Sequence, residues 1–159
     1  MLKFPVPAID LLPHAPPMLC IDALTAASET QAESVAHLAW GHILLEQDAI
    51  SEVGYIELAA QTAGAMKGYW EKIAGRPISD GYLAAVQNFT VFDKAFLGET
   101  VSIHITLLME LSGVRLIEAE IKRLPQKTSG NTTSTLLASG KLKLFLPEAS
   151  PEDENKIGT

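Results

Sequence analysis

A carboxylate and an amide stand four residues apart in a segment made mostly of small apolar residues. They are Glu57 and Gln61, in the run ELAAQTAG at residues 57–64. Side chains four residues apart share a helix face, so both point the same way, and Gly64 continues that face without bulk. A buried, alanine-rich helix has no structural need for a glutamate near its start. The pattern favours chemistry in a narrow apolar tunnel; the alternative is a carboxylate that only accepts hydrogen bonds at the first helical turn.

The remaining reactive side chains give weaker signals. His37 and His104 fall on predicted strand faces and are expected to be bystanders. The four histidines show no metal-ligand spacing, so the sequence predicts no metal site, and it gives no indication of a cofactor. Cys20 is the only cysteine, lies beside no basic residue that would activate it, and is expected in the core.

One long helix, over Ser51–Ala74, is predicted to carry the Glu57 pair. Ser51 can cap its first turn, and Gly75 followed by Pro77 ends it. Apolar side chains recur along it with the three-to-four spacing of a buried stripe, at Ile56, Ala59, Ala63, Met66, Trp70 and Ile73.

Strands are predicted on both sides of this helix. Two precede it and four follow it, and the residue-by-residue alternation is cleanest over Val101–Leu111, where one face is apolar from Val101 to Leu111. The predicted strands are 18–24, 31–40, 81–92, 101–111, 114–124 and 133–146. This layout predicts an α+β protein, an antiparallel sheet wrapped around one long central helix. A single domain over 1–147 is expected, followed by a charged tail, 148–159, expected to be disordered.

Composition and charge exclude several classes of function. A formal net charge of −7 argues against a nucleic-acid partner, since phosphate backbones are bound by clustered lysine and arginine. Membrane association is not expected, because no apolar stretch is long enough to span a bilayer and the proline-rich start, 1–17, lacks a signal-peptide core. A cytoplasmic location is therefore expected.

Three segments in order resemble the hotdog-fold 3-hydroxyacyl-ACP (acyl carrier protein) dehydratases. Residues 11–22, LLPHAPPMLCID, are similar to the family's N-terminal segment, and residues 56–64, IELAAQTAG, to its helix motif. Residues 89–101, which end in FLGETV, are similar to the strand and turn that follow. The resemblance covers about residues 9–146, and the subgroup it matches best is that of aryl-polyene-type lipid pathways.

The resemblance implies a catalytic acid at Glu57 and a catalytic histidine at His42, fifteen residues upstream, although the family's HFPG signature is absent around His42. Dehydration needs a base for the C2 proton, an acid for the leaving hydroxyl and donors for the thioester oxygen. A neutral imidazole suits the first role and a tuned carboxyl the second.

Four further residues are expected at the substrate site. The helix start at Gly54 and Tyr55 would supply backbone N–H groups to the thioester oxygen, Gln61 would assist Glu57, and His14 would line the pocket.

The resemblance also implies the partners. The substrate would be an acyl-ACP or acyl-CoA thioester, and an exposed sheet edge would be covered in a homodimer or in a heterodimer with another hotdog protein. In the family, one chain gives the histidine of each site and the other chain the acid. Two other functions remain open: a catalytically degenerate subunit that supports an active partner, and a hotdog thioesterase in which Glu57 activates water.

Overall fold

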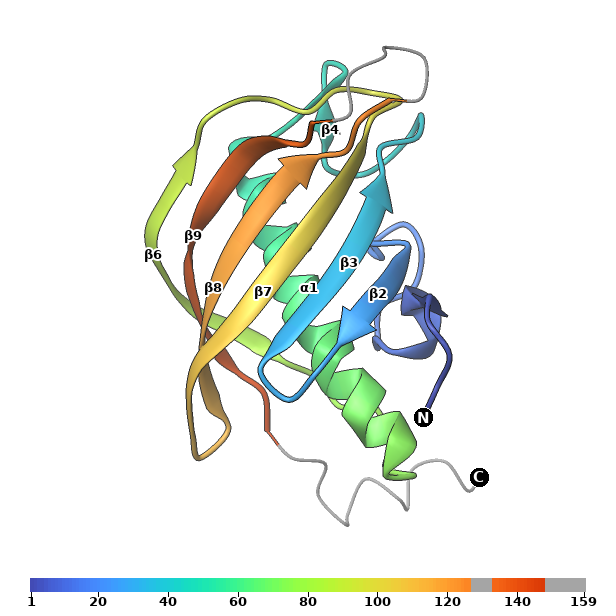
Figure 1. The fold of residues 1–159 in the computed structure, drawn as a ribbon, viewed down its shortest axis with the longest axis vertical. Helices are drawn as coiled ribbons and strands as arrows, with labels where there is room; N and C mark the ends of the chain where they lie inside the picture. The colour runs from blue at the N-terminus through green and yellow to red at the C-terminus, as the bar shows by residue number, and fades with distance from the viewer. Residues whose placement is uncertain (127–132, 148–159) are drawn as a thin grey trace.

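A single long helix is cradled by one curved antiparallel sheet (Figure 1). The structure, a computed structural model, describes residues 1–126 and 133–147. The predicted tail at 148–159 and most of the loop before 133 lie outside the described residues. The arrangement confirms the predicted α+β fold with a central helix.

The central helix, α1, spans Glu52–Ile73, within one residue of the predicted bounds. Ser51 caps it, since its Oγ accepts a hydrogen bond from the backbone N–H of Gly54 at 3.2 Å. Past its end, Gly75 adopts a φ of +69°, the left-handed conformation that glycine takes without strain and that terminates helices. The local signals at both helix ends therefore act as the sequence predicts.

Seven strands form the main sheet in the order β1-β2-β3-β7-β8-β9-β6, and every neighbouring pair is antiparallel. A separate two-stranded hairpin, β4-β5, precedes the helix where the sequence suggests no strand. The bounds are β1 Val6–Pro7, β2 Ala23–Ala27, β3 Gln31–His37, β4 Leu45–Glu46, β5 Ala49–Ile50, β6 Tyr82–Val91, β7 Thr100–Leu111, β8 Val114–Arg123 and β9 Thr135–Phe145, with a short 3-10 helix at Ala8–Asp10.

The first predicted strand, 18–24, is wrong for most of its length. Strand β2 begins only at Ala23, because the backbone at Met18 and Cys20 bonds to a helix side chain. The amide of Cys20 donates to Gln61 Oε1 and the carbonyl of Met18 accepts from Gln61 Nε2, both at 2.8 Å. These two bonds hold the segment against α1.

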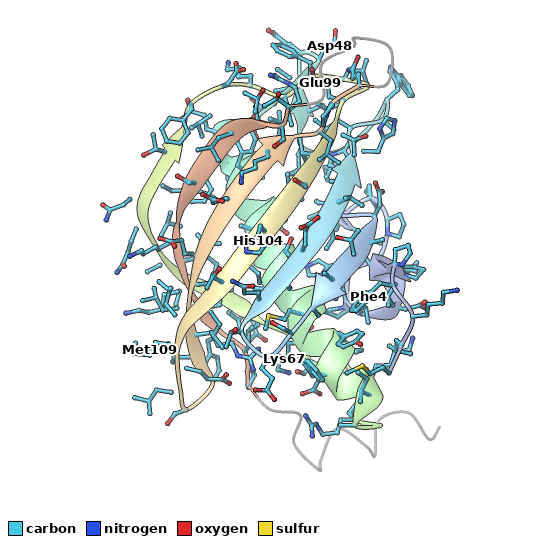
Figure 2. The ribbon with its side chains drawn as sticks, viewed as in Figure 1. Phe4, Asp48, Lys67, Glu99, His104 and Met109 are labelled. Carbon is cyan, nitrogen blue, oxygen red and sulfur yellow. The ribbon has the colours of Figure 1, made fainter. Side chains whose placement is uncertain are left out.

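The inner face of the sheet packs on α1 through alternating apolar residues. On β7, Val101, Ile103 and Ile105 are fully buried. The predicted alternation fails beyond this point, because a bulge between Leu107 and Met109 shifts the register with β8 and turns the end of the strand outward. Met109 lies exposed at the far end of the β7–β8 hairpin in Figure 2.

The N-terminal segment approaches the helix closely at one glycine. A Cβ on Gly68 would lie only 1.9 Å from the carbonyl oxygen of Leu11, a backbone atom that cannot rotate away. Nearby, Phe4 stacks on Tyr69 of the helix with ring centroids 5.0 Å apart. Gly68 thus fixes the position of the chain that leads to His14.

Candidate functional site

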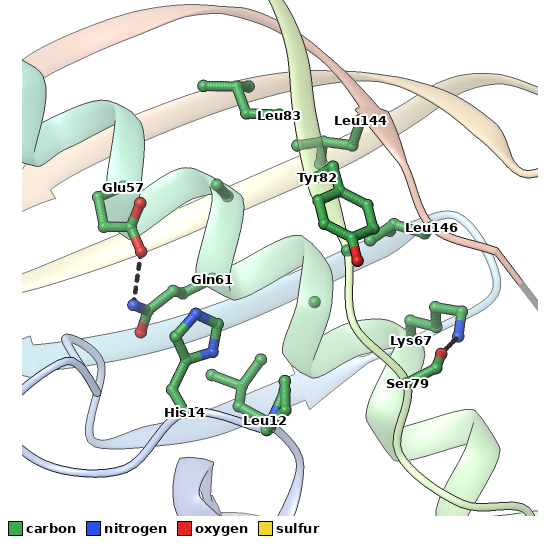
Figure 3. Close-up of a pocket in the computed structure, with 14 residues that line it drawn as sticks. Leu12, His14, Glu57, Gln61, Lys67, Ser79, Tyr82, Leu83, Leu144 and Leu146 are labelled. Carbon is green, nitrogen blue, oxygen red and sulfur yellow. Dashed lines mark hydrogen bonds between the residues drawn. The ribbon is translucent and has the colours of Figure 1, made fainter. Parts of the chain in front are cut away.

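One pocket runs along the face of α1 that carries the glutamate and glutamine (Figure 3). The N-terminal segment borders it on one side, and the start of β6 and the end of β9 border it on another. Its lining residues are Leu12, Pro13, His14, Glu57, Ala60, Gln61, Gly64, Lys67, Ser79, Gly81, Tyr82, Leu83, Leu144 and Leu146. The helix face predicted to be functional is therefore the face that lines a pocket.

Gln61 holds Glu57 in place. Its Nε2 donates to Glu57 Oε1 at 2.7 Å, while its two backbone bonds to the 18–20 segment fix the amide itself. Gln61 is 2% exposed, and its bond to the Cys20 amide lies away from solvent, where a hydrogen bond is strong and a lost one is costly, whereas its bonds to Met18 and Glu57 are partly buried. Glu57 is half-buried at the pocket wall, and its second carboxylate oxygen has no hydrogen-bond partner among the described residues, which leaves it for a ligand.

His14 lies in the same pocket. Figure 3 shows its ring beside the Gln61 amide, and His14 Nδ1 is buried without a hydrogen-bond partner in the part of the chain that the structure describes. Buried polar atoms are seldom left unpaired in native proteins. The ring nitrogen is thus available to a ligand in the pocket that also holds Glu57.

His42 lies outside this pocket, in the loop between β3 and β4. Its Nδ1 accepts from the backbone N–H of Leu44 at 3.3 Å, so its Nε2 carries the proton and donates to the carbonyl of Cys20 at 3.0 Å. Cys20 in turn bonds Gln61, which bonds Glu57. Within the described residues, the predicted pair is linked through Cys20 and Gln61, and no direct hydrogen bond joins it.

Gly54 and Tyr55, predicted to bind substrate, face the interior and do not line the Glu57 pocket. A Cβ on Gly54 would lie 2.9 Å from the Ile50 side chain. The hydroxyl of Tyr55 donates to the carbonyl of Asp93 and accepts from the amide of Ala95, and burial raises its pKa. Both residues anchor the start of the helix to the chain around β5 and after β6.

Cys20 is buried, as predicted, and its thiol is inert at neutral pH. Burial, with a smaller contribution from the negative charge of Glu57, raises the pKa of the Cys20 thiol to about 11. The thiolate, which is the reactive form, is therefore scarce near neutral pH.

Sequence reasoning missed a second polar group on the same helix face. Lys67 and Glu71 form a buried ion pair at 3.2 Å, and Lys67 also donates to Ser79 Oγ. The helical spacing could have indicated this pair, because positions 67 and 71 continue the three-to-four spacing of positions 57, 61 and 64.

An open groove lies between the first turn of α1 and the second half of β6, lined by Glu52, Val53, Ile56, Val86 and residues 88–91. No cluster of three metal-ligating side chains occurs within residues 1–126 and 133–147. Nor does any helix in those ranges have the length and apolar content needed to cross a membrane.

An antiparallel sheet wrapped around one long helix defines a protein of the hotdog fold. The chain belongs to the ApeP-like family, described as ApeP dehydratase, whose model matches residues 6–156. This match confirms the predicted family. A search of curated proteins found no match.

Solved structures share the fold at low identity. The dehydratase heterocomplex ApeI:P from Xenorhabdus doucetiae matches with a TM-score of 0.77 and 22% identity, over 97% of this chain and 99% of that chain. An uncharacterized protein from Pyrococcus horikoshii matches at 0.61 and 12%, over 92% and 96%. A hypothetical thioesterase with coenzyme A from Streptococcus pneumoniae matches at 0.55 and 9%, over 77% and 83%.

Proposed function

We propose that this protein dehydrates 3-hydroxyacyl thioesters carried on an acyl carrier protein or coenzyme A, with Glu57 as an acid–base group. The proposal rests on the 2.7 Å hydrogen bond from Gln61 to Glu57 inside a partly apolar pocket. An oriented carboxyl with one free oxygen is what proton transfer to a leaving hydroxyl requires. Membership of the ApeP dehydratase family supports the same reaction.

The reaction balances with two groups. A base takes the C2 proton, the C2–C3 double bond forms as the C3–O bond breaks, and the hydroxyl leaves as water with a proton from the acid. Glu57 is the proposed acid. Of the histidines in this chain, His14 shares the Glu57 pocket and its Nδ1 has no partner within residues 1–126 and 133–147, whereas both ring nitrogens of His42 bond to backbone. We therefore place His14 first as the base, and retain His42 as a candidate for a site completed by a second chain.

An assay of the reverse reaction tests this assignment. Hydration of a 2-enoyl thioester consumes a conjugated double bond and is followed by absorbance. Glu57→Gln keeps the shape and the hydrogen bond to Gln61 but cannot transfer a proton, so it should abolish activity while leaving the fold intact. Loss in His14→Ala with activity retained in His42→Ala supports the proposed base; the opposite pattern assigns the base to His42.

A folded wild-type protein without activity would overturn the self-sufficient enzyme and favour the degenerate subunit. Release of free acid, in place of hydration, would favour the thioesterase. The cytoplasmic location expected from the sequence stays a prediction.

We further propose that a second hotdog chain adds to the free edge of β6. Among the strands that the structure describes, this strand pairs only with β9, and it exposes Tyr82, Leu83 and Val86. A ten-residue edge strand with exposed apolar side chains is a ready template for pairing with another chain. The partner would also cover the groove between the first turn of α1 and β6. That ApeI:P is a heterocomplex supports a different hotdog chain as partner.

Light scattering during size-exclusion chromatography tests the interface. The wild-type chain should be a dimer, alone or with a co-expressed hotdog dehydratase, and Val86→Lys should dissociate it. A dimer that survives Val86→Lys places the interface elsewhere.

A further inference from the structure

Beyond Gly64 the pocket combines charged and hydroxyl groups with the apolar side chains of Leu144 and Leu146. Lys67 on α1 bonds Ser79, which precedes β6, and Ser79 Oγ also donates to the carbonyl of Pro147 at 3.3 Å. Tyr82 lines the same side, and Figure 3 shows its hydroxyl pointing toward the Lys67 side of the pocket. A pocket meant only for an alkyl tail would end in apolar side chains.

Stability gives no reason for this cluster. Lys67 is 5% exposed and Glu71 3%, so both charges have lost most of their hydration. The attraction within a buried ion pair seldom outweighs that loss, and an apolar pair of the same size often stabilises a protein at least as well. The cluster therefore points to a role in binding.

The cluster is also incompletely bonded. A lysine ammonium has three donors, and those of Lys67 with partners in the described chain go to Ser79 and Glu71. Glu71 Oε2 is buried and has no hydrogen-bond partner among the residues described. The exposed Arg76 adds a second positive charge 3.7 Å from Glu71 Oε1. An oxygen acceptor that reaches Lys67 would meet the third N–H donor, which has no partner among the described residues, close to two positive charges and one carboxylate.

The distance between Glu57 and Lys67 sets the length of the ligand that could contact both. Lys67 is ten residues beyond Glu57, which is about 15 Å along a helix. We propose, on the basis of the function proposed above, that Lys67 selects acyl chains whose distal end carries a hydrogen-bond-accepting oxygen, with the thioester end at Glu57. A methyl-ended chain of the same length would leave the ammonium unsatisfied and is disfavoured.

Binding of two matched ligands tests this without requiring turnover. The probes are acyl-pantetheine amides of equal length, long enough to reach about 15 Å from the amide, one ending in methyl and one in hydroxyl. Nitrogen replaces the thioester sulfur, so neither dehydration nor hydrolysis interferes. Isothermal titration calorimetry on the full-length wild-type chain should show the hydroxyl-ended probe binding about tenfold more tightly, the effect of one hydrogen bond to a charged group.

Variants assign the preference to the cluster. Lys67→Met with Glu71→Leu replaces the whole ion pair, which avoids an orphaned buried charge, and should abolish the preference while methyl-ended binding is kept or improved. Lys72→Met removes an exposed lysine of the same helix and should keep the preference.

Equal wild-type affinity for the two probes would overturn this inference and leave the proposed function intact, and this comparison suffices even if the double variant does not fold. A preference that persists in a folded double variant would also overturn it. Binding of neither probe would overturn both proposals.

Discussion

Replacing Gly68 by alanine should destabilise the protein, although alanine favours helices. The added Cβ would lie 1.9 Å from the carbonyl oxygen, 2.8 Å from the carbonyl carbon and 3.2 Å from the Cα of Leu11. All three are backbone atoms of a residue that is fully buried. The N-terminal segment must therefore move by more than 1 Å, roughly the gap to an ordinary contact, and His14 moves with it.

The magnitude follows from two opposing terms. Overpacking a core costs about 1–3 kcal/mol, and a clash with backbone belongs at the upper end of that range. Alanine gains about 1 kcal/mol over glycine in helix propensity. The net loss is about 2 kcal/mol, which at a urea slope of about 2 kcal/mol/M lowers the midpoint by about 1 M.

Gly64→Ala is the matched control. Its Cβ would meet only a terminal methyl carbon of Leu12, at 2.9 Å, which can rotate away. The gain in helix propensity then offsets the cost of this close contact, and the free energy of unfolding should stay within about 1 kcal/mol of the wild-type value. Equilibrium urea unfolding of the three proteins measures this. A Gly68→Ala variant as stable as the wild type would refute the close approach of Leu11 to the helix.

Three further substitutions and titrations follow from buried contacts. Tyr55→Phe leaves the carbonyl of Asp93 and the amide of Ala95 without their partner and should cost about 1–3 kcal/mol in thermal or urea unfolding. Gln61→Leu leaves the Cys20 amide without its partner, removes one of two donors to the Met18 carbonyl and releases the Glu57 carboxylate, so it should cost about 2–4 kcal/mol and reduce thioester hydration; unchanged activity would contradict the positioning role. The Cys20 thiol, with its pKa raised from 9.0 to about 11, should react slowly with thiol reagents until the pH nears 11. The contribution of this protonated thiol to the free energy of unfolding is present below pH 9 and is lost between pH 9 and 11. Cys20→Ala should remove this pH dependence.

The central helix could be predicted from the sequence because its signals are local. A serine cap at Ser51, apolar residues at helical spacing and Gly75 past the end give its bounds within one residue. Strands β7 and β8 were predicted by alternation for the same reason. The bulge after Leu107 was not, since it arises from pairing with β8 and leaves no mark in the residues of one strand.

The site could be predicted only in part. Spacing placed Glu57 and Gln61 on one face, and the structure puts a pocket there. The segment from Met18 to Cys20 reads as a strand, and only the folded protein shows its backbone bonded to Gln61. The proximity of His14 to this helix face depends on tertiary packing at Gly68 and has no counterpart in local sequence.

Mass spectrometry of the product is the most direct test of the dehydratase assignment. A purified 3-hydroxyacyl thioester would be incubated with the full chain, alone and with a co-expressed hotdog dehydratase, beside the Glu57→Gln variant. We expect the wild-type chain to form a thioester lighter by one water, and Glu57→Gln to abolish this product. Free acid as the product, or an enoyl thioester formed equally well by the variant, would contradict it.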